Sequence, residues 1–62
     1  MKRRELIKKL ESIGFELYRN GGNHDIYKRG ADNEVIPRHK EINEINEINE
    51  NLAKAILRKW GL

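Results

Sequence analysis

The sequence predicts an α+β fold in the order α-β-β-β-α, with a three-stranded antiparallel sheet and two helices. Three observations lead to this prediction. Apolar residues recur at helical spacing near both ends of the chain, and the shorter segments between them show the alternation expected of strands. Turn signals that contain glycine separate these shorter segments, which is typical of an antiparallel meander.

The first helix is predicted over residues 3–13. Its apolar positions recur at i, i+1, i+4 and i+7 and form one stripe, which consists of Leu6, Ile7, Leu10 and Ile13. Gly14 follows at the place where a residue with positive φ commonly ends a helix.

Three short strands are predicted over residues 15–19, 23–29 and 34–36. In the first strand, alternation places one set of side chains on one face and the other set on the opposite face: Phe15, Leu17 and Arg19 against Glu16, Tyr18 and Asn20. The turn Asn20-Gly21-Gly22 is a strong signal because both glycines tolerate positive φ. A second polar turn is expected over residues 30–33, and Pro37 should end the third strand.

The second strand leaves the direction of its side chains open. In a regular strand, His24, Ile26 and Lys28 share one face, while Tyr27 shares the other with Asp25 and Arg29. Ile26 and Lys28 cannot both suit a core, and a bulge near the turn could rotate His24.

The C-terminal segment is predicted to be a helix that ends near Gly61. One side is expected to carry Leu52, Ala55, Ile56 and Lys59, with a stripe widened by Ala53, Leu57 and Trp60. Before it, residues 42–50 repeat the triplet Ile-Asn-Glu three times.

Two interpretations of the triplets compete. The helix begins either near Asn43, as an extension that carries isoleucines, or after Asn49 as N-cap, with Glu50 in the first turn. We favour the extension, because the triplets contain no glycine or proline. Exposed isoleucines on such an extension would seek a partner, so homo-oligomerisation through this helix is a hypothesis.

Length and composition limit the protein class. With 62 residues, the chain is expected to form a single domain over 1–62 with a thin core. Without cysteine it has neither disulfides nor thiolate metal sites. The net charge of +3 suits a nucleic acid or an acidic protein as partner, although solvated surface lysines explain it equally well. No apolar stretch is long enough for a membrane span or follows the basic start as a signal peptide would, so we expect a cytoplasmic location.

His24 is the strongest candidate for chemistry. Histidine is the side chain best suited to exchange a proton near neutral pH. Glycines before it would let a polyanion approach the backbone, and the imidazole could remove the proton of a ribose 2′-hydroxyl that then attacks the adjacent phosphate. Lys28, Arg38 and Lys40 could neutralise the phosphate. The ordinary alternative is an exposed turn histidine without any role.

His39 is a weaker candidate, because the run Pro37-Arg38-His39-Lys40 is typical of a basic surface loop. His24, Asp25 and His39 form no recognisable metal-ligand set, so neither a metal site nor a cofactor is predicted.

Several stretches taken together resemble the HicA family of toxins from toxin–antitoxin pairs. They are residues 4–11 with Gly14-Phe15, then Gly21-Gly22-Asn23-His24, Ile36-Pro37-Arg38-His39, and residues 55–62. They cover nearly the whole chain except the surplus triplets. Family members commonly have one such triplet segment, so two triplets look inserted by duplication or by engineering.

The resemblance implies a fold like that of double-stranded-RNA-binding domains, with one exposed sheet face. It also implies a metal-independent mRNA interferase whose essential histidine follows the glycine turn, a position that His24 matches. An antitoxin of the HicB type would cover the active face. The RNA contacts expected from this comparison and from the basic residues are Gly22, Asn23, Lys28, Arg38, His39 and Lys40.

Two other functions stay open at this point. One is a non-catalytic double-stranded-RNA-binding module, which would show salt-sensitive binding without products. The other is an engineered helix-insertion variant of a HicA-like scaffold, which the perfect triplet repetition suggests.

Overall fold

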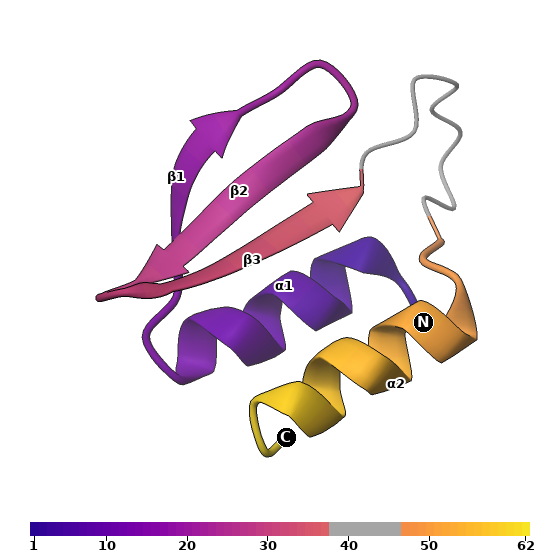
Figure 1. The fold of residues 1–62 in the computed structure, drawn as a ribbon. Coiled ribbons are helices and arrows are strands. Elements are labelled where there is room, and N and C mark those ends of the chain that lie inside the picture. Colours follow the sequence, from indigo (N-terminus) through magenta and orange to yellow (C-terminus); the bar gives the residue numbers. More distant parts are fainter. Residues whose placement is uncertain (38–46) are drawn as a thin grey trace.

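A computed structural model describes residues 1–37 and 47–62 of the chain. Its elements are α1 (Arg3–Ser12), β1 (Glu16–Asn20), β2 (His24–Arg29), β3 (Asp32–Pro37) and α2 (Glu50–Lys59). The strands form one antiparallel sheet in the order β1-β2-β3, as Figure 1 shows. The predicted α+β fold with α-β-β-β-α order is therefore confirmed.

The first helix follows its sequence prediction closely. Leu6 and Leu10 are fully buried, and Ile7 and Ile13 pack against the core from the edges of the same stripe. Gly14 follows the helix with φ of 103°, a backbone conformation that side chains disfavour.

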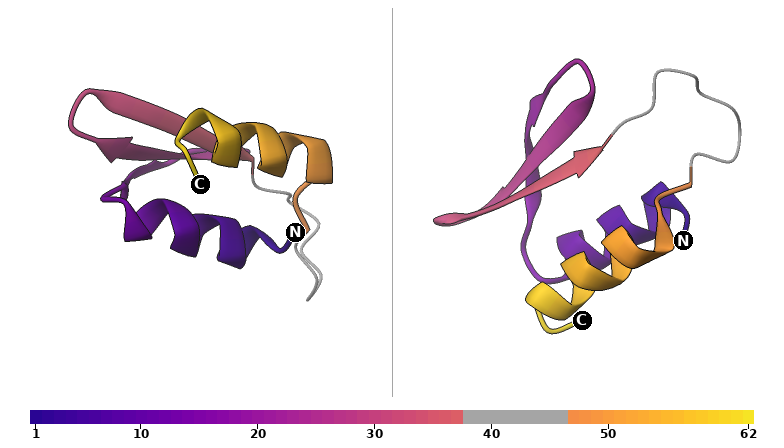
Figure 2. Two further views of the ribbon diagram at one scale, coloured as in Figure 1. Left: turned by 90° about the horizontal axis from the view of Figure 1, so that it is seen from below. Right: turned by 45° about the vertical axis from the view of Figure 1, so that its right-hand side comes forward.

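Both helices cover the same face of the sheet and run in the same direction (Figures 1 and 2). Arg3 of α1 bonds to Asp25 of β2, and Trp60 after α2 donates to Glu34 of β3 across 2.7 Å. The register places the two carboxylates on one face, because Asp25 pairs with Ile36 and Glu34 with Tyr27. The core lies between this face and the helices, and it consists of Leu6, Leu10, Phe15, Tyr27, Ile36, Ile48, Ala53 and Ile56.

A β-bulge interrupts the alternation predicted for β1. Leu17 pairs with Tyr27 as expected of a core-directed position, but the next pair is Arg19 with Ile26. The extra residue, Tyr18, shifts the pairing of the later β1 residues with β2 by one position. The prediction that Arg19 shares a face with Leu17 is therefore wrong.

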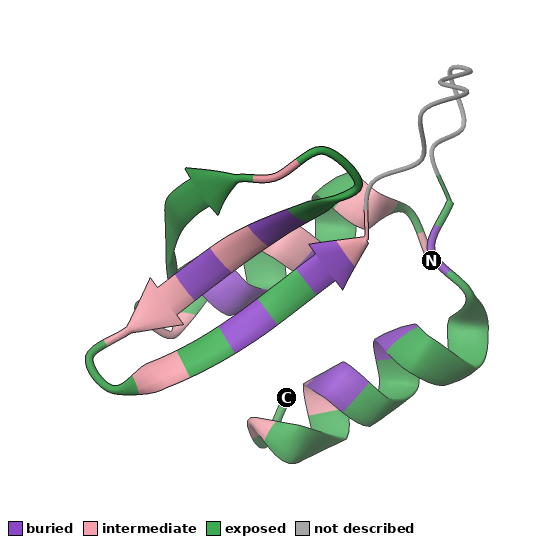
Figure 3. Cartoon of the chain, turned by 45° about the horizontal axis from the view of Figure 1, so that its top comes forward, coloured by how far each residue is buried: buried purple, intermediate pink, exposed green. Residues whose placement is uncertain are grey.

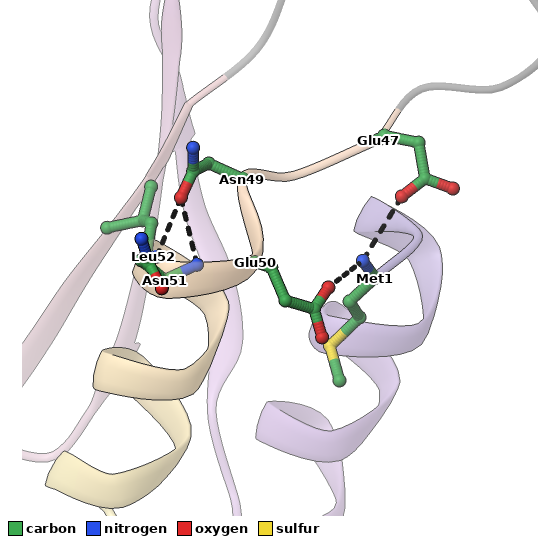
Figure 4. Close-up of polar contacts among 6 residues, drawn as sticks. All are labelled: Met1, Glu47, Asn49, Glu50, Asn51 and Leu52. Carbon is green, nitrogen blue, oxygen red and sulfur yellow. Dashed lines mark hydrogen bonds and ion pairs between the residues drawn. The ribbon is translucent and has the colours of Figure 1, made fainter.

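The start of α2 contradicts the extended helix that we favoured. The Asn49 side chain accepts hydrogen bonds from the backbone N–H groups of Asn51 (2.9 Å) and Leu52 (3.2 Å), as Figure 4 shows. These bonds satisfy two N–H groups that have no partner inside a helix. The second interpretation, with Asn49 as the N-cap of α2, is confirmed. Residues 42–46 of the triplets lie outside the described residues.

The segment before Asn49 is held by the N-terminus instead of by helical bonds. Ile48 is buried, and its N–H donates to the Met1 carbonyl oxygen at 2.9 Å. The Met1 ammonium bonds the carboxylates of Glu50 at 2.7 Å and Glu47 at 3.1 Å (Figure 4). These bonds raise the pKa of the Met1 amine above its ordinary 8.0, and the ammonium lowers the pKa of Glu50 below 4.5.

The buried side of α2 also differs from the predicted one. Ala53 and Ile56 are buried and Leu57 and Trp60 pack against the core, which is the i, i+3, i+4, i+7 pattern. Leu52 and Ala55, expected on the apolar side, are exposed. The packing of Ala53 and Ile56 against the core sets the rotation of the helix and leaves these two residues outward. No helix in the described part of the chain is both long and apolar enough to cross a membrane.

Candidate active site

The turn between β1 and β2 is tight because a backbone N–H group and a backbone carbonyl group hydrogen-bond across it. The Gly21 N–H donates to the His24 carbonyl oxygen at 2.6 Å. A Cβ atom on Gly21 would lie 2.6 Å from the same oxygen, whereas one on Gly22 would meet open space. Neither glycine has a positive φ, so the reason given from the sequence is wrong. Gly21 is required for the close approach of the backbone.

The two faces of β2 differ in burial. Asp25 and Tyr27 are buried toward the helices, while His24 is exposed and Ile26 and Lys28 are half-buried. Figure 3 shows the alternation of buried and less buried positions along the strands. Since side chains alternate along a strand, the second set points away from the helices. We call this side the open face. It carries His24, Ile26 and Lys28 of β2 and the residues paired with them.

A hollow of about 500 Å³ lies on the open face beside the glycine turn. Its lining consists of Arg19, Asn20, Gly21, Gly22, His24, Ile26 and Val35. The exposed imidazole thus adjoins a concave surface with a cation and two apolar side chains. A phosphodiester could enter such a hollow with its charge facing the guanidinium.

Three of the six predicted RNA contacts lie among the described residues. Gly22 lines the hollow with His24, and the exposed Asn23 lies between them in the turn. Lys28 shares the open face but lies four residues farther along β2, about 13 Å by strand geometry, with its ammonium 4.3 Å from the centre of the Tyr18 ring. Arg38, His39 and Lys40 lie outside the described residues, so their roles stay predictions.

Arg19 is the site residue that the sequence analysis missed. Simple alternation assigned it to the face of Phe15 and Leu17, but the bulge turns it to the open face opposite Ile26. One indication of this position was present in the sequence: a cation, Arg19, ends a predicted strand face whose other members, Phe15 and Leu17, are apolar.

The backbone around His24 is held from the covered side by Arg3. Its guanidinium bonds the Asp25 carboxylate and donates from Nε to the Pro37 carbonyl oxygen at 3.0 Å. Pro37 pairs with His24 across the strands, so Arg3 joins both strands at the level of His24. The Asp25 and Arg3 side chains are only 5% and 12% exposed, which makes this contact largely dry.

A family profile described as the HicA toxin of bacterial toxin–antitoxin systems matches residues 3–62. The chain belongs to the HicA toxin family. Neither the comparison with curated proteins nor the comparison with solved structures gave a match. The resemblance found in the sequence is therefore confirmed by the family profile alone.

Membership in the HicA family supports a toxin-type function in mRNA cleavage and a toxin–antitoxin context with an antitoxin partner. The match extends over the turn that bears His24, over the Arg3–Asp25 contact and over the whole of α2. Among residues 1–37 and 47–62 of this HicA chain, no group of three or more His, Cys, Asp or Glu side chains could hold a metal ion.

Proposed function

We propose that this HicA-family chain is a metal-independent endoribonuclease of mRNA in which His24 acts as the general base. His24 removes the proton of a ribose 2′-hydroxyl, and that oxygen attacks the adjacent phosphorus. The bond to the 5′ oxygen breaks, this oxygen takes up a proton, and a 2′,3′-cyclic phosphate remains or is later hydrolysed.

One observation carries the proposal: an exposed imidazole at the edge of an open hollow that also contains Arg19. The base can reach a bound ribose without any movement of the core. Arg19 can neutralise charge that develops on the phosphate in the transition state. Lys28 on the same face, and Arg38, His39 and Lys40 directly after Pro37 in the sequence, would add contacts to neighbouring phosphates.

The open face is also the expected binding surface of the antitoxin. We propose that a HicB-type protein inhibits the enzyme by covering the open face, since an uncovered His24 would cleave cytoplasmic mRNA. We do not propose homo-oligomerisation, because the extended helix on which that hypothesis depended is not formed at residues 47–49.

The test compares the two histidines. His24→Ala should lower the rate of RNA cleavage in chelator about 10²- to 10⁴-fold, the range for loss of a general base. His39→Ala, which also removes one imidazole, should lower it much less. Thermal unfolding of His24→Ala should match the parent chain, because His24 is exposed.

Three results would contradict the proposal. Cleavage by His24→Ala at the parental rate would show that His24 is not the general base. Loss of cleavage in chelator would contradict metal independence. Salt-sensitive RNA binding without any products would favour a binding module in place of an enzyme.

A further inference from the structure

The open face has a row of chemically different side chains that crosses all three strands. Arg19 of β1 pairs with Ile26 of β2, and Ile26 pairs with Val35 of β3. All three line the hollow beside His24. Neighbouring strands lie about 4.8 Å apart, so a cation and a flat apolar strip lie next to each other. Val35 is 46% exposed on this face.

The bulge adds an aromatic ring to this surface. Tyr18 is the extra residue of the bulge and is 62% exposed. The Lys28 ammonium lies 4.3 Å from the centre of its ring, and Lys28 belongs to the open face. The ring is therefore held on that face by a cation–π contact while most of its surface stays accessible.

The charge of the open face favours a polyanion over a protein segment as its partner. Arg19 and Lys28 are cationic, and Glu16, opposite Lys28, is the acidic side chain that the register places on this side of β1–β3. The two other strand carboxylates with long-range contacts, Asp25 and Glu34, are buried under the helices.

Duplex RNA would leave most of this surface unused. Double-stranded RNA presents phosphates and 2′-hydroxyls and is recognised mainly by its shape, whereas an unpaired nucleotide also exposes the flat faces of its base. Aromatic and apolar side chains beside a cation are the typical means of holding such a base.

We infer that the open face holds one unpaired nucleotide of the RNA next to His24. Arg19 binds its phosphate, Ile26 and Val35 contact its base, and Tyr18 stacks on the neighbouring base. This inference rests on the proposed function, since it names the substrate of the same site as single-stranded RNA and assigns a subsite to it.

The test uses a short fluorescent 2′-O-methyl RNA, which lacks the nucleophilic hydroxyl and cannot be cleaved. Fluorescence anisotropy with the unaltered chain then measures binding whether or not His24 is the base. We expect the single strand to bind at least tenfold more tightly than the same strand annealed to its complement. Equal or tighter binding of the duplex would overturn the inference.

Two variants test the stacking ring and the cation. Tyr18→Ala should weaken binding of the single strand about tenfold, as loss of one stacked base does, and Tyr18→Phe should restore it. Arg19→Ala should weaken binding and reduce its salt dependence. Arg58→Ala makes the same charge change on an exposed position of α2, which covers the other face, and should have little effect.

A matched pair tests the apolar strip. Val35 and Leu17 are almost equally exposed, at 46% and 49%, but Val35 pairs with Ile26 of the open face and Leu17 with Tyr27 of the covered face. Val35→Glu should abolish RNA binding and Leu17→Glu should retain it, with circular dichroism confirming that both fold. Parental RNA affinity in Val35→Glu, Tyr18→Ala and Arg19→Ala would show that the open face is no RNA subsite and would overturn the inference. Cleavage by His24→Ala would instead contradict only the assignment of the base.

Discussion

Each face of the sheet carries a few side chains that would be expected on the other face, although the core residues Tyr27 and Ile36 lie on the covered face and the cations Arg19 and Lys28 on the open face. The face under the helices contains two buried carboxylates, Asp25 and Glu34, which are 3% and 9% exposed. The open face instead presents Tyr18 and Val35 to solvent. A small domain would be expected to bury the apolar groups and expose the acids.

The difference is explained by what each face contacts. Each buried carboxylate has a partner from a helix region: Asp25 bonds Arg3, and Glu34 accepts from the Trp60 indole and lies 3.5 Å from the Lys59 ammonium. Such contacts specify where the helices lie, because a buried charge without its partner is costly. The exposed apolar groups contribute little to folding. Val35 lines the hollow beside His24, and Tyr18 lies against Lys28 on the same face, which indicates a surface used for binding.

The largest effect on stability is expected from the buried ion pair. Asp25→Ala leaves the Arg3 guanidinium in a largely dry place and should lower the free energy of unfolding by about 3–5 kcal/mol. The matched control is Asp32→Ala. Asp32 also pairs with an arginine, Arg29 at 2.8 Å, but the two side chains are 41% and 37% exposed, so the cost should stay below about 1 kcal/mol. Urea unfolding followed by circular dichroism measures both.

A loss that large approaches the whole stability of a chain of this size. If Asp25→Ala does not fold, the double variant Arg3→Met, Asp25→Leu should fold again, since it removes both charges together. Equal costs for Asp25→Ala and Asp32→Ala would contradict the distinction between a buried and an exposed pair.

An intermediate effect is expected at the turn that presents His24 on the open face. Gly21→Ala places a methyl group 2.6 Å from the His24 carbonyl oxygen, so the turn must shift, at a cost of about 1–3 kcal/mol. Gly22→Ala adds the same methyl group in open space with no positive φ and should leave the thermal midpoint nearly unchanged. A Gly21→Ala protein as stable as Gly22→Ala would show that the close approach does not constrain the turn.

The smallest effect is expected from the exposed ion pair at the start of α2. The Met1 amine has a raised pKa when folded, so its contribution to stability is present below its ordinary value of 8.0 and is lost as the pH rises through the raised value. Glu50→Gln should reduce this loss of stability above pH 8.0, because Glu50 accepts the shorter hydrogen bond from the amine. Glu5→Gln makes the same change in the first turn of α1 and should leave the pH profile unaltered. Identical profiles for Glu50→Gln and the parent chain would contradict the role of this pair.

The features that were predicted correctly depend on residues close together in the chain. The stripe that includes Leu6 and Leu10 needs only helical spacing, and Gly14 needs only a helix before it. The order of three strands follows from turn signals a few residues long. The position of His24 beside a glycine turn was likewise visible in the sequence, and the family match adds the toxin class.

The features that were missed depend on contacts between distant segments. Periodicity alone allowed α2 to begin near Asn43. Its start at Glu50 is decided by the Asn49 cap together with the burial of Ile48 and the bonds from Met1, which lies more than forty residues away in the chain. A repeat of equivalent triplets offers several starts of similar local preference, so only packing can choose among them.

The sequence by itself therefore determined the elements, their order and the histidine at the turn, because propensity and turn chemistry act over a few neighbouring residues. Only the tertiary structure decided which face of the sheet is open and that Arg19 shares it with His24. The open face is the one that the two helices leave uncovered. Arg19 shares it because of a single extra residue, Tyr18, since the period of a strand is two and one insertion sends the later side chains of β1 to the other face.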